Sequence, residues 1–408
     1  MKKLLLVLFF LPLASLGQKK ITYPELINRL VDLEYLAKPP LNGEVSGSFS
    51  SYDRKSKYDF DTKSYINWHA NGDGTGYVRK ENNNIVVFEQ DGPGVIWRVW
   101  SALALSGHIK IYIDNQKTPI IDQPFSDFFE QLNEENVELP KNLPGLPSVN
   151  LPELMSTLSR GRNRFIPIPF QKNCKIILEE GWGMYYHITY TKFSDKELEL
   201  PKFNGIYSKQ DLITLAQTDR ILYNRGFRRK KYEEEQIIDF DIQNLSKSSH
   251  WETSLNGSGS INHFEITYNE IEYETPKKRK EMLENLWIQF TWDNDSKPSV
   301  LAPFGMFFGT YPDIYPNRTL PVGAIPGNFY SNWFMPYSDR AKIKIINKGE
   351  NLHNIKISIA FSLSNETKNL LRFHAKWHEG KYKNEVNNKG RNIDWPILIT
   401  EGNGRYCG

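Results

Sequence analysis

The sequence predicts an all-β protein that contains two β-sandwiches in tandem. The strongest observation is an internal repeat: residues 109–129 read IKIYIDNQKTPIIDQPFSDFF and residues 288–308 read IQFTWDNDSKPSVLAPFGMFF, with matching positions 179 residues apart. Both copies alternate apolar and polar side chains, turn at Asp-Asn and end in Phe-Phe, which is typical of a strand, a turn and a second strand. A duplicated unit within 408 residues favours two domains, each with its own core.

The repeat extends beyond these strands. Residues 164–193 are echoed by residues 332–361, and Pro169-Phe170 matches Pro336-Tyr337 at a separation of 167 residues. The shorter separation indicates that the second copy lost residues from a connecting loop, as surface loops commonly do. We therefore expect a first sandwich over residues 81–193 and a second over residues 236–380.

Residues 1–17 have the pattern of a signal peptide. A basic start precedes an apolar run from Leu4 to Ala14, and small residues occupy the positions before a cut at Gln18. The apolar run is shorter than the roughly 20 residues that span a bilayer, and no other segment qualifies. We expect export through the secretory pathway to the periplasm or the extracellular space, with no membrane span.

The charge balance excludes some classes of partner. Lys and Arg number 51 against 48 Asp and Glu, and no basic run is interleaved with aromatic residues, which argues against nucleic acid. No glycine-rich phosphate loop precedes a helix, which argues against nucleotide chemistry, and no cofactor is expected. Cys174 and Cys407 are the only cysteines, and the sequence leaves open whether they pair.

Residues 18–80 are expected to form a helix followed by a loop segment. Thr22 and Glu25 have the spacing of a capping box, and Pro39-Pro40 ends the helical pattern, so the sequence predicts a helix over Thr22–Lys38. This helix is expected to pack on the first sheet.

The loop segment contains the pair Asp53 and Arg54, followed by the glycine-rich stretch Asn71–Gly76. Asp53 could accept hydrogen bonds from sugar hydroxyls, and Arg54 could hold a carboxylate nearby. The same pair could equally be a local tether of the loop.

The segment VIWRVWSA, after the turn at Asp91–Gly94, reads as a strand. Strict alternation puts Arg98 and Trp100 on one face and Trp97 on the other. Either tryptophan could fill the core or stack on a ligand, and the core is the simpler interpretation for each.

Residues 194–235 read as a linker. Their apolar content falls, and Arg225–Glu235 places a basic block beside an acidic one, which predicts a solvated linker helix. After the second copy, His374 and His378 have the i, i+4 spacing of a metal pair, but they would need a helix and a third ligand, so no metal is expected. His374 and Trp377 are more simply explained as lining a pocket.

Residues 381–408 look like the start of a third β-domain. The segment DWPILITEGNGRYCG alternates like a strand and contains a Gly-Asn-Gly turn, after which the sequence ends. Because a lone hairpin would leave backbone groups unpaired, we expect a truncated domain and therefore a fragment of a longer protein.

Taken together, SSYDR, DGPGVIWRVW, the repeated IYID/P/DFF unit, FHAKWH and the closing DWPIL with its glycine turn resemble the domain of unknown function 2961, part of glycoside hydrolase family 172. The resemblance runs from about Pro24 to Gly408. It implies tandem jelly-roll β-sandwiches, homo-oligomeric rings and retaining cleavage of furanosides of the fructofuranoside or arabinofuranoside type. The implied partner is an oligo- or polysaccharide that contains furanose sugars.

Retaining hydrolysis needs two carboxyl groups, and the family motif Gly-Thr-Gly-Ser/Thr-Glu-Asp-Tyr-Phe that carries the nucleophile is not found here. No catalytic residue therefore carries over. Six positions carry over as candidates for substrate binding: Asp53, Arg54, Trp97, Arg98, His374 and Trp377. The alternative is a non-catalytic carbohydrate-binding or structural β-sandwich protein.

Overall fold

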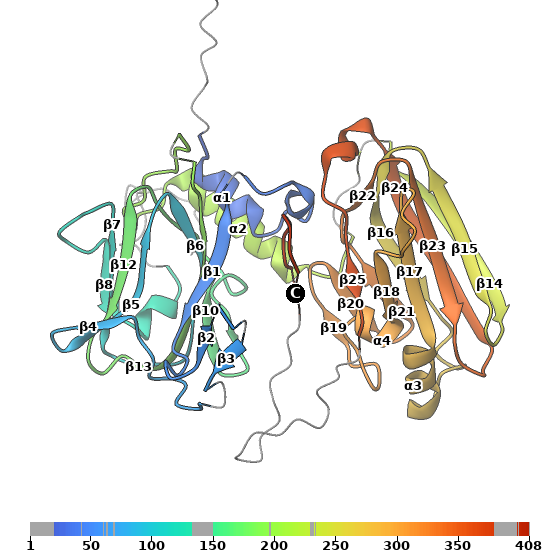
Figure 1. The fold of residues 1–408 in the computed structure, drawn as a ribbon, viewed down its shortest axis with the longest axis horizontal. Coiled ribbons are helices and arrows are strands. Elements are labelled where there is room, and N and C mark those ends of the chain that lie inside the picture. The colour runs from blue at the N-terminus through green and yellow to red at the C-terminus, as the bar shows by residue number, and fades with distance from the viewer. Residues whose placement is uncertain are drawn as a thin grey trace, which may run out of the picture.

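The computed structural model describes residues 20–41, 43–59, 61–62, 64–67, 70–132, 150–195, 197–228, 232, 234–378, 398 and 400–407. Figure 1 shows two β-sandwiches side by side, with helices α1 (Tyr23–Arg29) and α2 (Lys209–Tyr223) on the side of the first sandwich that faces the second. The prediction of an all-β protein with tandem sandwiches is confirmed. The expected signal peptide and most of the expected third domain lie outside the described residues.

The first sandwich has two antiparallel sheets. One has the order β1-β13-β6-β10-β9, with β11 also paired to β6: β1 Val45–Ser50, β13 Gly183–Lys192, β6 Gly94–Ala104, β10 Gly161–Arg164, β9 Thr157–Leu158 and β11 Ile168–Phe170. The other has the order β4-β5-β12-β7-β8: β4 Arg79–Glu81, β5 Asn84–Asp91, β12 Asn173–Leu178, β7 His108–Ile113 and β8 Ile121–Pro124. A separate hairpin joins β2 (Lys57–Asp59) and β3 (Ser64–Ile66).

The second sandwich repeats this arrangement. One sheet has the order β14-β24-β16-β21-β20-β19, with β22 paired to β16: β14 Gln236–Leu245, β24 His353–Leu363, β16 Gly259–Thr267, β21 Asn328–Ser331, β20 Val322–Ile325, β19 Asn317–Arg318 and β22 Met335–Tyr337. The other has the order β15-β23-β17-β18-β25: β15 His250–Asn256, β23 Arg340–Asn347, β17 Leu286–Trp292, β18 Val300–Pro303 and β25 Ala375–Lys376. The duplication is therefore a duplication of whole sandwiches.

Each sandwich has its own core. Phe88 and Ile111 are fully buried in the first core, to which α1 contributes Leu26. Phe264 and Trp292 are fully buried in the second. The remaining helices are short: 3-10 turns at Tyr35–Ala37, Asp127–Phe129 and Asn365–Asn369, and α3 (Pro276–Asn285) and α4 (Phe304–Phe307).

The repeated Asp-Asn turn has the same structural task in both copies. Asp114 and Asp293 have positive φ angles of 54° and 55°, which a short polar side chain tolerates. Oδ1 of Asp114 accepts hydrogen bonds from the backbone N–H groups of Gln171–Lys172 at 2.8 and 2.6 Å, and Oδ1 of Asp293 does the same with Ser338–Asp339 at 2.6 and 2.7 Å. The aspartate of each copy therefore ties its turn to the following strand pair.

Two predicted helices differ in extent from the observed ones. The capping box of Thr22 and Glu25 is present, but α1 ends at Arg29 rather than Lys38. Asp32 ends the helical pattern, because its Oδ1 accepts the N–H groups of Glu34 and Tyr35 at 3.0 and 3.1 Å and favours a tight turn.

The predicted helical linker between the sandwiches is confirmed, but its helix is formed by other residues than the expected charged block. The helix is α2, which a capping box of Ser208 and Asp211 begins, and it ends before the charged block Arg225–Glu235. The described residues of that block are not helical.

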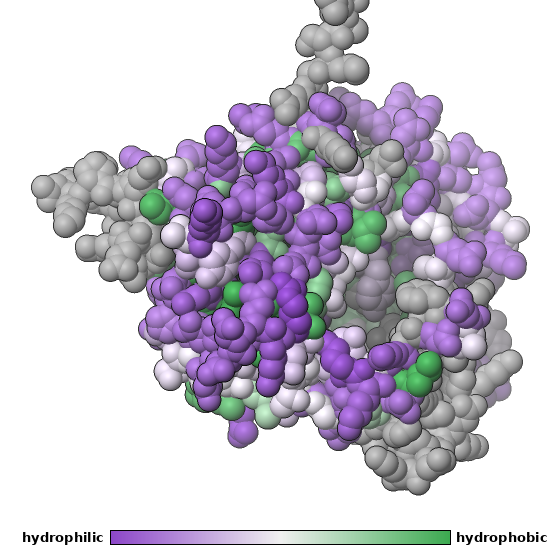
Figure 2. Space-filling view, turned by 60° about the vertical axis from the view of Figure 1, so that its left-hand side comes forward, coloured by the Kyte–Doolittle hydropathy of each residue, from purple (hydrophilic) through white to green (hydrophobic). Residues whose placement is uncertain are grey.

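Figure 2 shows a mainly hydrophilic surface on the face turned toward the viewer, with small separate hydrophobic patches. Among the described residues, no helix is long and apolar enough to cross a membrane. Cys174 is buried in β12, Cys407 is exposed, and both thiols are free.

The segments at the two ends of the described chain meet. Arg405 forms a two-pronged ion pair with Glu44, at 2.6 and 3.2 Å, and its guanidinium lies 4.8 Å from the ring centre of Tyr35. The Glu44 side chain is only 5% exposed, so this pair is shielded from solvent.

Candidate functional site

A concavity of about 420 Å³ lies on the first sandwich where β1 ends beside β13 and β6. Its lining combines aromatic, basic, acidic and hydroxyl side chains: Ser50, Ser51, Tyr52, Asp73, Arg98, Trp100, Tyr186 and His187. Volumes of this size are typical of small-ligand sites. Aromatic rings together with polar groups suit a ligand that has both an apolar face and hydroxyl groups.

A β-bulge in β6 determines which side chains reach this surface. Thr189 of β13 pairs with Arg98 and Tyr190 pairs with Ile96, so Trp97 has no partner in the ladder. The expected alternation is wrong at this point, because an extra residue places two successive side chains on one face. Trp97 turns to the same face as Arg98, where its Nε1 donates to Thr191 Oγ1 at 2.9 Å.

Trp100 covers a strand position that has no side chain. A Cβ atom on Gly161 of β10 would lie 2.2 Å from Trp100 Nε1, so the indole can approach β10 this closely only because residue 161 is glycine. This glycine fixes the aromatic wall of the concavity.

Arg98 and His187 supply polar groups to the concavity. Arg98 Nε donates to Asn163 Oδ1 at 2.9 Å, and its Nη1 lies 3.5 Å from Nδ1 of His187. Burial lowers the pKa of His187, and the neighbouring Arg98 lowers it further, so the imidazole is neutral at pH 7. Burial also raises the pKa of Tyr186 to about 12, so its phenol stays protonated.

Asp53 and Arg54 hold the loop that borders the concavity. Oδ2 of Asp53 accepts the N–H of Gly72 at 2.9 Å, and the Asp53 N–H donates to Asp73 Oδ1 at 2.8 Å. Hydrogen bonds from Lys55 and Gly72 lower the pKa of Asp53. These contacts are those of a local tether.

The Arg54 guanidinium forms hydrogen bonds with the backbone. It donates to the carbonyls of Tyr77, Tyr52 and Ser50 at 3.1, 3.2 and 2.8 Å, and it lies 3.9 Å from the ring centre of Tyr52. Arg54 thereby fixes the orientation of Tyr52, a residue that remains 48% exposed at the rim.

His374 and Trp377 lie on the second sandwich, not at this concavity. Their segment forms β25, which pairs in parallel with β18, and it is not helical. Trp377 is 41% exposed and packs edge-on against Trp287, with ring centres 5.6 Å apart. Among the described residues, no group of three His, Cys, Asp or Glu side chains is arranged to hold a metal ion.

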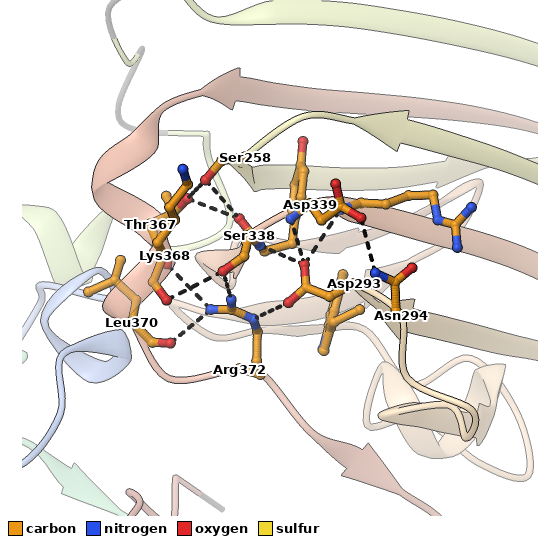
Figure 3. A network of polar contacts seen from close by, with 12 residues as sticks. Ser258, Asp293, Asn294, Ser338, Asp339, Thr367, Lys368, Leu370 and Arg372 are labelled. Carbon is orange, nitrogen blue, oxygen red and sulfur yellow. Dashed lines mark hydrogen bonds and ion pairs between the residues drawn. The ribbon is translucent and has the colours of Figure 1, made fainter.

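Arg372 anchors this segment, as Figure 3 shows. Its Nε donates to Asp293 Oδ2 at 3.0 Å, and its Nη1 donates to the carbonyls of Leu370 and Thr367 at 2.8 and 3.3 Å. Arg372 also contacts the Ser338 hydroxyl. The repeated turn of the second sandwich therefore positions the segment that carries His374 and Trp377.

Comparison with protein families found two matches. Residues 42–211 match the GH172 first beta-sandwich domain, and residues 239–361 match the GH172 domain-like model. This chain belongs to glycoside hydrolase family 172. The two matches coincide with the two sandwiches, so the chain is a glycoside-hydrolase-like protein of this family.

A comparison with curated proteins found no match. Among solved structures, the serine protease of Aeromonas sobria matches with a TM-score of 0.17 and 9% identity. The match covers 39% of this chain and 31% of the protease chain. The major capsid protein P2 of bacteriophage PM2 matches with a TM-score of 0.21 and 7% identity, over 78% of this chain and 97% of that one. These TM-scores are too low to add to the description of the GH172 chain.

The structure assigns to the concavity seven residues that sequence reasoning did not select: Ser50, Ser51, Tyr52, Asp73, Trp100, Tyr186 and His187. Asp73 stands inside the glycine-rich loop, and Tyr52 precedes the Asp53-Arg54 pair, so loop position could have identified both. Tyr186 and His187 lie in a strand whose alternating pattern gives no sign of a ligand site.

The second GH172 sandwich has a concavity of about 420 Å³ at the matching place, on β14, β24 and β16. Its lining is Asp239, Phe240, Asp241, Glu265, Thr267, Lys356, Ile357 and Ser358. The bulge of β6 is also repeated: Ile261 pairs with Phe361 and His263 with Ala360, leaving Asn262 without a partner. Counting from Gly94 and Gly259, His263 corresponds to Arg98 and Glu265 to Trp100. The backbone is repeated, whereas the side chains of the two concavities differ.

Proposed function

We propose that this GH172 chain binds furanose-containing saccharides in the concavity of the first sandwich and acts in the retaining hydrolysis of fructofuranosides or arabinofuranosides. The observation that carries the proposal is the lining, in which Trp100 and the exposed Tyr52 stand beside Arg98, Asp73 and His187. Aromatic faces stack on the C–H face of a sugar, and charged and hydroxyl groups bind its hydroxyls.

The lining positions a saccharide but does not supply a complete retaining mechanism. Retaining hydrolysis uses two carboxyl groups about 5 Å apart, one as nucleophile and one as acid and base. Among the described residues, the concavity contains one carboxylate, Asp73, and its Oδ1 already accepts the Asp53 N–H at 2.8 Å. Hydrolysis therefore requires at least one carboxyl group from outside this lining.

The proposal includes two properties that the N-terminal sequence and the family suggest. We propose that the protein is exported to the periplasm or the extracellular space, and that it forms homo-oligomers. N-terminal sequencing of the exported protein should find Gln18 as the first residue, and light scattering should give a mass above that of one chain. An uncleaved N-terminus argues against the first property, and a monomer argues against the second.

The test measures binding and hydrolysis on the full chain. Isothermal titration with an arabinofuranose trisaccharide should give saturable binding, and Trp100→Ala should weaken it by about 5- to 10-fold, since an aromatic contact contributes on the order of 1 kcal/mol. Tyr223→Ala, at a residue 70% exposed on α2, is the matched control and should bind like the parent. Absence of binding, or equal effects of the two variants, refutes the site.

The single lining carboxylate favours one alternative, a non-catalytic carbohydrate-binding protein. Hydrolysis of 4-nitrophenyl arabinofuranoside and of a fructofuranosyl disaccharide separates the two functions. Binding with release of product supports the hydrolase. Binding without any release, under conditions in which the parent is folded, supports the alternative.

A further inference from the structure

Arg98 is a half-buried cation at the concavity, and no acidic side chain in the described part of the chain pairs with it. Its neighbours within the described chain are neutral: Asn163 Oδ1 at 2.9 Å, His187 Nδ1 at 3.5 Å, and the rings of Trp100 and Phe165 at 5.9 and 5.7 Å. No carboxylate of the described residues forms an ion pair with it within 4 Å. Burying an unpaired charge is costly, so such groups are normally paired.

The neutral neighbours cannot take over the role of an acid. Asn163 is 4% exposed, and its Nδ2 donates to the carbonyls of Ser156 and Gly161 at 3.2 Å each, so only its oxygen faces Arg98. The imidazole of His187 is neutral and cannot offset a positive charge. The guanidinium therefore retains hydrogen-bonding capacity and a full charge next to an open volume of about 420 Å³.

In the second sandwich, the position equivalent to Arg98 has an acidic neighbour on its own strand. His263, the counterpart of Arg98, has its Nε2 3.9 Å from Glu265 and its Nδ1 2.7 Å from Asn332 Oδ1. Glu265 is the counterpart of Trp100. One copy of the bulge thus places an acid two residues after the basic side chain, and the other copy places an indole there and leaves the cation to an outside group.

We propose that Arg98 binds an oxyanion carried by the saccharide, so that the preferred ligand of this concavity is an acidic sugar. A planar guanidinium binds a carboxylate or a sulfate through paired hydrogen bonds, and both groups present the required oxygens. Trp100 and Tyr52 then hold the sugar ring, and Arg98 reads its charged substituent. This inference rests on the proposed function, because it concerns the same concavity.

The experiment uses the full chain and three probes that differ only in the group at the terminal C5. They are the arabinofuranose trisaccharide, the same compound with its terminal C5 oxidised to a carboxylate, and its 5-O-sulfate ester. Isothermal titration should show that one or both charged forms bind at least 10-fold more tightly than the neutral form. The two charged arms distinguish a uronate-type ligand from a sulfated one.

Variants test whether Arg98 is responsible. Arg98→Gln should lower the affinity for the charged form about 10- to 100-fold and the affinity for the neutral form at least 5-fold less than that, because the neutral form loses only hydrogen bonds to its hydroxyls. Arg98→Lys keeps the charge and should retain part of the preference, which shows that the site still folds. Arg220→Gln, at an exposed residue of α2, removes the same net charge elsewhere and should bind like the parent.

The outcomes are distinct. If the parent binds all three probes equally, or if Arg98→Gln loses neutral and charged probes alike while Arg98→Lys restores neither, the inference is wrong. If the neutral probe binds through Trp100 without any charge preference, the proposed function stands and only this inference fails. If none of the three probes binds, both are wrong.

Discussion

The repeated Asp-Asn turn gives a prediction with its own internal control. Asp114 and Asp293 occupy equivalent turns, and each accepts two backbone N–H groups from the following strand pair. Asp293 also accepts the Arg340 N–H at 3.4 Å and, unlike Asp114, an arginine side chain, Arg372 Nε at 3.0 Å. Asp114→Asn and Asp293→Asn therefore make the same chemical change in two settings. Asparagine tolerates the positive φ of both turns, so neither variant adds backbone strain.

The expected losses differ because of Arg372. Asp114→Asn weakens charge-assisted hydrogen bonds into neutral ones, which costs about 1 kcal/mol. Asp293→Asn has the same cost, and it also turns an amide nitrogen or an uncharged oxygen toward a guanidinium that is 19% exposed. Because that pair is only partly shielded, the extra cost is about 1–2 kcal/mol rather than the 3–5 kcal/mol of a fully buried pair.

Thermal unfolding measured by calorimetry tests this difference. For sandwiches of this size each kcal/mol shifts the Tm by roughly 2–4 °C, so Asp293→Asn should lower the second sandwich's transition by about 4–12 °C and Asp114→Asn should lower the first by about 2–4 °C. Exchange of the Ala375 and Trp377 amides, which donate to Ser299 and Leu301, should also accelerate in Asp293→Asn. Equal Tm shifts, or unchanged exchange at β25, would refute the role given to Arg372.

Low pH should reduce the stability difference between the parent and Asp293→Asn. Burial raises the pKa of Asp293, but the N–H of Asp339 and the Arg372 guanidinium outweigh burial and hold the pKa below its usual value. A carboxyl group with a lowered folded pKa stabilises the protein above its unfolded pKa, and this stability is lost as the pH falls through the folded pKa. The difference in the free energy of unfolding between the parent and Asp293→Asn should therefore decrease at low pH and remain constant above about pH 5.

Three further predictions concern other parts of the fold. Burial lowers the pKa of His353 to about 4, so stability should fall by about 2–3 kcal/mol between pH 6.5 and 4, and urea unfolding of His353→Phe should lack this slope. Glu44→Gln leaves the Arg405 guanidinium without its carboxylate, which should cost about 3 kcal/mol and speed limited proteolysis within residues 400–407; unchanged cleavage contradicts this. Gly161→Ala places a Cβ 2.2 Å from Trp100 Nε1, so titration should show saccharide binding at least 5-fold weaker with a Tm within about 2 °C of the parent; unchanged binding contradicts the placement of the indole.

The fold was predictable to the extent that it depends on period and repetition. Alternation and the matched Asp-Asn turns identified both copies, because a buried sheet face imposes a strict period on the chain. The length of α1 was not predictable from its apolar positions. The side chain of Asp32 competes for the backbone N–H groups that would continue the helix.

The site was less predictable because it depends on an irregularity. The bulge at Trp97 breaks the alternation that assigned faces to Trp97, Arg98 and Trp100, and no residue of VIWRVW marks it in advance. Arg54 was selected for its charge, yet three backbone carbonyls occupy its guanidinium. His187 joins Arg98 only through strand pairing, which a single sequence does not show.

The bulge shared by β6 and β16 also carries information about descent. A backbone irregularity found at the same strand position in both halves is most simply explained as older than the divergence of the halves, whereas Trp97 and Asn262 record changes made after it. Selection could thus alter the chemistry of one half while the other half kept a histidine beside a glutamate. The chain holds two versions of one ancestral surface. Exchanging Trp97, Arg98 and Trp100 with their counterparts Asn262, His263 and Glu265 would show how much of the recognition depends on side chains alone.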